Sequence, residues 1–127
     1  MPHHTLFLRG SIPTDSLEVV ARTVFGALGV EVWEERLSSN YPPDDHYFAG
    51  YTENVELTVY DDDSSTKSGY PFHLALEEAT WRKGPKQIAA DPKQIAETLA
   101  RVGISVFVPA GAWYKTDWDG KGDLYAA

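Results

Sequence analysis

The chain has 127 residues, 43% of them hydrophobic, which is enough for one domain spanning residues 1–127 with a single core. Its 19 acidic and 11 basic residues give a formal net charge of -8, so nucleic acid and anionic membranes would be repelled and a basic partner is favoured. It contains no cysteine, which excludes disulfides, thiolate zinc sites and cysteine nucleophiles.

The N-terminal part of the chain predicts a strand followed by a helix. Residues 6–8 are apolar without interruption, which indicates a central strand covered on both faces. Residues 16–28 are predicted to be helical, because apolar residues recur at helical intervals and Gly29 supplies a stop. Asp15 and Glu18 have the spacing of a capping box at the start of this helix.

Three further strands are predicted in the middle of the chain. Residues 30–37 contain valine and tryptophan, which suit a pleated surface, and become polar at the far end. Residues 55–60 alternate between apolar and polar side chains, and residues 72–76 repeat this pattern. The polar, turn-forming segment 61–69 is then the connection of a hairpin.

A second helix and a last strand complete the predicted fold. Asp91 is predicted to cap a helix that begins at Pro92 and stops at Gly103, and residues 104–109 form an apolar strand beside the first one. The order predicts a single-domain α+β sandwich: a mainly antiparallel sheet with two helices on one face, ferredoxin-like with an added hairpin strand. The other face of the sheet is expected to be free for docking.

Residues that could carry chemistry are few. Asp44, Asp45 and His46 are suitable types for a divalent metal or a general base, but adjacent loop positions rarely converge on one point. No metal-binding, hydrolase, phosphate-binding or dinucleotide-binding motif occurs, and His73 is expected on a sheet surface. We therefore predict a non-enzymatic protein with no catalytic residue, metal or cofactor; an enzyme using Asp45 and His46 is the minority interpretation.

Acidic and aromatic side chains gather outside the predicted core, in two loops and in the C-terminal tail. Tryptophan and tyrosine are frequent anchors of protein interfaces, and aspartates attract a basic partner. The candidate partner-binding residues are Tyr41, Asp44, Asp45, His46 and Tyr47; Asp61, Asp62 and Asp63; and Trp113, Tyr114, Asp117, Trp118 and Asp119. For the tail, folding back to cover the open sheet is an alternative to partner binding, and both can hold for different residues.

The segment WEERLSSNYPPDDHYFAGYTENVELTVYDDD, residues 33–63, resembles a segment of the small immunity proteins of bacterial toxin systems, including contact-dependent growth inhibition. The resemblance covers about a quarter of the chain and carries over no individual site residue. It implies a protein that binds the basic C-terminal toxin domain of a sibling cell's effector, typically a nuclease, and blocks its active or substrate-binding surface.

Two expectations accompany this interpretation. The apolar run before Arg9 is too short for a signal peptide or a membrane span, so the protein is expected in the cytoplasm. The alternative function is a small-molecule-binding or regulatory ferredoxin-like domain, dimeric through its sheet. The sequence leaves open whether the immunity protein would be a monomer.

Overall fold

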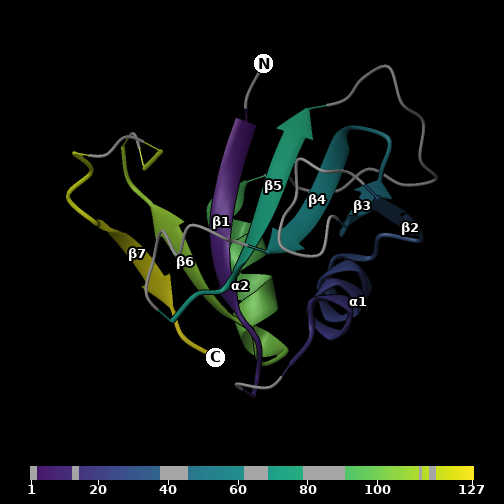
Figure 1. The fold of residues 1–127 in the computed structure, drawn as a ribbon, viewed down its shortest axis with the longest axis horizontal. Coiled ribbons are helices and arrows are strands. Elements are labelled where there is room, and N and C mark those ends of the chain that lie inside the picture. The colour runs from purple at the N-terminus through teal and green to yellow at the C-terminus, as the bar shows by residue number, and fades with distance from the viewer. Residues whose placement is uncertain are drawn as a thin grey trace.

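The computed structural model describes residues 3–12, 15–37, 46–61, 69–78, 91–111, 113–114 and 117–127 (Figure 1). Its elements, in chain order, are β1 His3–Arg9, α1 Leu17–Leu28, β2 Val32–Leu37, β3 His46–Tyr51, β4 Val55–Asp61, β5 Phe72–Glu78, α2 Pro92–Arg101, β6 Ser105–Pro109 and β7 Gly122–Tyr125.

The strands within the described residues form one antiparallel sheet in the order β2-β3-β4-β5-β1-β6-β7. Both helices pack on the same face of this sheet, so the predicted α+β class is confirmed. The four strands β4-β5-β1-β6 have the order of the ferredoxin-like arrangement, with β1–α1 and β5–α2 as the strand–helix units. Strands β2, β3 and β7 extend this sheet at its two edges.

Two of these strands were not predicted from the sequence. The segment His46–Tyr51, whose first residue was placed in a loop, forms β3, and Gly122–Tyr125 in the tail forms β7. The sequence of β3 shows no alternation of apolar and polar side chains, because Ala49 and Gly50 are small and because residues 48–51 are buried on both faces of the sheet. A Cβ at Gly50 would lie 2.7 Å from a ring carbon of Phe25, so glycine permits close packing of α1 on β3.

The start of α1 differs by one residue from the predicted capping box. Ser16 is the N-cap, and its side chain accepts a hydrogen bond from the backbone N–H of Val19. Asp15 instead accepts from the backbone N–H of Ile12, at 3.2 Å, and so closes the preceding turn. Gly29, with a φ of 72°, ends the helix as predicted.

The start of α2 is as predicted. Asp91 caps it by accepting from the backbone N–H of Lys93, and Pro92 occupies the first turn. Ile95, Ala96 and Leu99 are the buried residues of this helix. They join the main core, which fills the space between the helices and one face of the sheet.

The opposite face of the sheet is not free over its centre, which corrects the sequence-based expectation. Phe7 of β1 and Phe107 of β6 are buried there together with Tyr70. The side chains of Trp113 and Trp118, from the connection between β6 and β7, pack on this second cluster. The β1 strand is therefore covered on both faces, as its unbroken apolar run predicts.

Candidate protein-binding surface

The strand register brings several predicted contact residues to one end of the sheet. β2 ends at Leu37, which lies opposite His46, the first residue of β3. The β3–β4 register pairs Phe48 with Val59. His46 comes two residues before Phe48, and Asp61 comes two residues after Val59, so both lie at the end of the sheet where β2 ends. We call the end of the sheet at which β2 ends, β3 begins and β4 ends the acidic end.

Both acidic connections of the sequence are attached to this end. Residues 38–45 join β2 to β3, and residues 62–71 join β4 to β5, so each connection starts and finishes at the acidic end. Five of the predicted contact residues in them lie outside the described residues: Tyr41, Asp44, Asp45, Asp62 and Asp63. His46, Tyr47 and Asp61 are described, and each is half-buried.

Charged side chains at the centre of β2 lie next to the acidic end, and the sequence alone did not single them out as contacts. Arg36 donates to Glu34 at 2.8 Å, and its guanidinium lies 5.9 Å from the centre of the Tyr51 ring. Hydrogen bonds to Glu34 and Tyr47 raise the pKa of Arg36 above its usual value. Arg36 is therefore positively charged, and its charge is matched by Glu34.

Glu35 interacts on the other face of the same strand. Its carboxylate lies 2.7 Å from Nδ1 of His46, and the His46 ring is 5.6 Å from the ring of Phe48. Successive strand residues point to opposite faces, so Glu34 and Glu35 present carboxylates on both sides of β2. The only sequence signal for this arrangement is the exposed, charged centre of the VWEERL strand.

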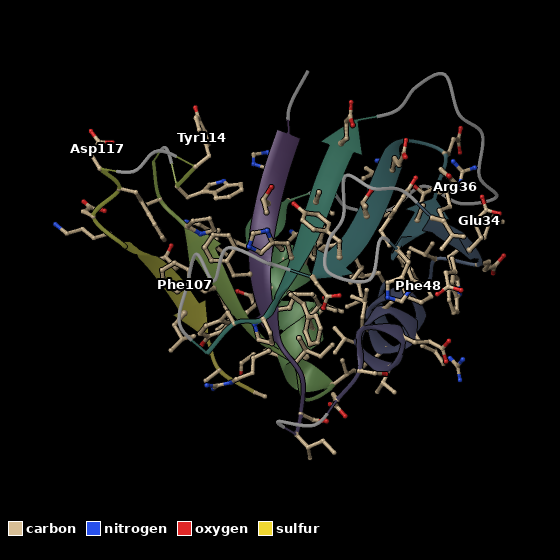
Figure 2. All side chains as sticks on the ribbon, in the orientation of Figure 1. Glu34, Arg36, Phe48, Phe107, Tyr114 and Asp117 are labelled. Carbon is tan, nitrogen blue, oxygen red and sulfur yellow. The ribbon has the colours of Figure 1, made fainter. Side chains whose placement is uncertain are left out.

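The predicted contact residues of the tail lie elsewhere. Asp61 is opposite Phe72, and Phe72 is opposite Leu8, near the C-terminal end of β1. β6 begins at this same end, with Val106 opposite Leu8, and runs to Pro109. The connection to β7 therefore leaves from the end opposite to the acidic end, and the sheet separates the two groups of residues. Figure 2 shows Tyr114 and Asp117 at one edge of the molecule and Glu34 and Arg36 at the other.

Hydrogen bonds hold the connection between β6 and β7 in a defined shape. The backbone N–H of Ala110 donates to the carbonyl of Lys121 at 2.9 Å, which closes the base of the connection. The indole N–H of Trp118 donates to the carbonyl of Ala110 at 2.9 Å. Asp119 accepts from the backbone N–H of Lys121 at 3.0 Å.

The two tryptophans of this connection pack edge-on against Phe7. The ring centres of Trp113 and Trp118 lie 5.4 Å and 6.0 Å from that of Phe7, each with an interplanar angle of 88°. On the same face His73 stacks on Phe7 at 4.6 Å and contacts Trp113 edge-on at 5.5 Å. His73 is only 3% exposed, so the expectation that it lies on an open sheet surface is wrong.

The tail thus contains residues that cover the sheet and residues that face solvent. Trp113 and Trp118 cover the second cluster, whereas Tyr114 is 72% exposed and Asp117 and Asp119 are exposed. Of the two alternatives that the sequence left open for the tail, covering of the sheet holds for Trp113 and Trp118, and partner binding stays a prediction for the exposed residues. Tyr114, Asp117 and Asp119 are available for contact with a partner.

The described residues also bear on metal binding and on membrane crossing. Across those ranges, no group of three or more histidine, aspartate or glutamate side chains could hold a metal ion. Of the residues proposed for the minority enzyme interpretation, Asp45 lies outside the described part of the chain. None of the described helices combines the length and apolar character needed to cross a membrane.

Comparisons with known proteins gave no relatives for this chain. A scan against protein-family models found no match, and searches of curated proteins and of solved structures found none.

Proposed function

We propose that the chain is a cytoplasmic immunity protein that binds a cognate basic toxin domain, a nuclease, and occludes its active or substrate-binding surface. The observation that carries the proposal is the acidic end of the sheet. Two connections containing Asp44 and Asp45, and Asp62 and Asp63, are attached there beside Asp61. The net charge of -8 supports a basic partner.

Electrostatics explains why such a surface suits this task. A nuclease presents positive charge to phosphates, so an acidic inhibitor is attracted to the surface that the substrate would occupy. Opposite potentials on the two partners accelerate their encounter, and aromatic side chains such as Tyr47 then contribute buried contact area. The proposed inhibitor acts by occupying this surface and needs no catalytic residue.

The alternative function is a small-molecule-binding or regulatory domain that dimerises through its sheet. The ferredoxin-like order of β4-β5-β1-β6 favours it. However, Trp113 and Trp118 cover β1 and β6 on the face that such a dimer would use. A thermal shift with a metabolite, together with a dimer in the absence of any toxin domain, would favour this alternative.

Complex formation tests the immunity function directly. The protein is mixed at low salt with the toxin domain encoded immediately upstream of it, and the mixture is analysed by gel filtration. We expect one complex, which weakens as salt is raised because exposed charges are screened. Cells that express the toxin domain should grow only when this protein is also expressed. Absence of a complex at low salt would rule the proposal out.

A further inference from the structure

Strand β2 is one of the two edge strands of the sheet formed by the described residues. In the described part of the chain no strand pairs with β2 on the side away from β3. β2 pairs with β3 along all six of its residues, so it is regular and without a bulge. An edge strand of this kind presents unpaired N–H and C=O groups to which another extended chain can be added.

β2 lacks some of the usual protections of an exposed edge and has others. Natural edge strands are commonly protected by proline, by a bulge, by short length or by charged side chains, including ones that point inward. The charged residues of β2 are Glu34, Glu35 and Arg36, so the strand resists pairing with an acidic strand more than with a basic one. β2 contains no proline or lysine, and the guanidinium of its one cation, Arg36, is bonded to Glu34. Val32 and Leu37, at the two ends of the strand, are 48% and 81% exposed. The other edge strand, β7, has only four residues and starts with glycine.

The charges of β2 indicate which kind of chain fits its edge. Glu34 and Glu35 stand at the centre of the strand on opposite faces, and their side chains are 54% and 51% exposed. A strand added here would place its own central residues beside these carboxylates, where opposite charges across two strands are stabilising. Its outer residues would meet Val32 and Leu37. The complementary strand is therefore basic at its centre and apolar at its ends.

A second copy of this chain does not fit that pattern. Antiparallel pairing of β2 with its own copy in the three fullest registers sets Glu34 opposite Glu34, Glu34 opposite Glu35, or Glu35 opposite Glu35. The last register also sets Glu34 opposite Arg36, but the charge of Arg36 is already matched by Glu34 of its own strand. Like charges directly opposite each other destabilise a strand pair. The charge pattern favours a different, basic protein.

We propose that β2 binds an extended basic segment of a protein partner by strand addition, so that the partner's strand extends the sheet beyond β2. The inference deepens the proposed function, on which it rests for the source of that strand, namely the toxin domain. Strand addition would supply backbone hydrogen bonds and a fixed strand register, which make the association more specific than attraction between charges alone.

A synthetic peptide tests the strand addition without the toxin domain. The probe is the capped octapeptide TVTKKTVT, which has a basic centre and apolar residues towards its ends. A second version carries N-methyl groups on its four central residues. Successive backbone N–H groups of a strand point to opposite edges, so this version loses bonds to β2 whichever edge it presents.

We expect saturable binding of the unmodified peptide. The N-methylated version should bind at least about tenfold more weakly, because several hydrogen bonds are lost together. Amide hydrogen exchange should show new protection at every second residue of β2. The double substitution Glu34→Lys and Glu35→Lys should weaken binding, whereas the matched control Glu53→Lys and Glu97→Lys, which alters net charge equally, should not.

Several results would overturn strand addition. These are no binding of the peptide, equal binding of the unmodified and the N-methylated peptide, protection at β7 in place of β2, or a peptide-independent dimer that protects β2. The toxin domain separates this inference from the proposed function. A complex with that domain in which β2 gains no protection would leave the immunity function standing and overturn the strand addition.

Discussion

Two glycines show how single residues fix the packing of α1 on the sheet. A Cβ at Gly50 would lie 2.7 Å from the Phe25 ring and 2.9 Å from a methyl carbon of Val30, whereas a Cβ at Gly26, in α1, would meet nothing within 4 Å. We predict that Gly50→Ala lowers the free energy of unfolding by about 1–3 kcal/mol through overpacking. The matched change Gly26→Ala should raise it by about 0.5–1 kcal/mol, because alanine favours the helix.

Chemical denaturation of the two variants measures both effects. Equal changes in the midpoint would show that α1 does not approach β3 as closely as described. The sequence could not have predicted this contact, because the importance of Gly50 depends on Phe25, which reaches β3 only through the folded arrangement. Residue-scale predictions from the sequence were reliable where the determinant is local, as at Asp91 and Gly29.

At the scale of an element, the connection between β6 and β7 is divided between anchoring and exposed residues. We predict that Trp118→Ala lowers the free energy of unfolding by about 2–3 kcal/mol, less than for a fully buried tryptophan, because it removes the contacts with Phe7 and Phe107. Trp118→Phe should cost about 1 kcal/mol, since it loses chiefly the hydrogen bond to Ala110.

Tyr114→Ala is the control within the same connection. Its side chain is exposed, so we expect stability to change by less than about 0.5 kcal/mol. Thermal unfolding of the three variants provides the measurement. If Tyr114→Ala destabilised the protein as much as Trp118→Ala, the division between covering and exposed residues would be wrong.

The elements differ in how far the sequence specifies them. The helices and the alternating strands β4 and β5 follow from periodicity and caps, which are local signals. β3 and β7 escaped prediction because β3 is buried on both faces and β7 has four residues beginning with glycine. The burial of His73 could not be predicted either, because it depends on Trp113, forty residues further along the chain.

At the scale of the whole molecule, sheet topology decides which of the predicted contact residues can act together. The sequence indicated acidic and aromatic residues in three segments, but only strand order shows that two of these segments are attached to one end and the third to the other. The charged centre of β2 belongs with the first group. The central claim is therefore that the acidic end captures a basic protein.

Charge reversal at the acidic end tests this claim most directly. The triple substitution of Asp61, Asp62 and Asp63 by lysine is compared with a control in which Glu53, Glu97 and Asp123, which lie elsewhere on the surface, are replaced by lysine. Both variants change the net charge equally, so a difference between them reports the position of the charges and not their sum.

The measurement is the association rate constant with the upstream-encoded toxin domain at low salt, obtained by stopped-flow mixing. We predict that the acidic-end variant associates at least about tenfold more slowly than the native protein, and more slowly than the control, because steering depends on where the charges lie. An unchanged rate for the acidic-end variant, or an equal loss in the control, would contradict the account.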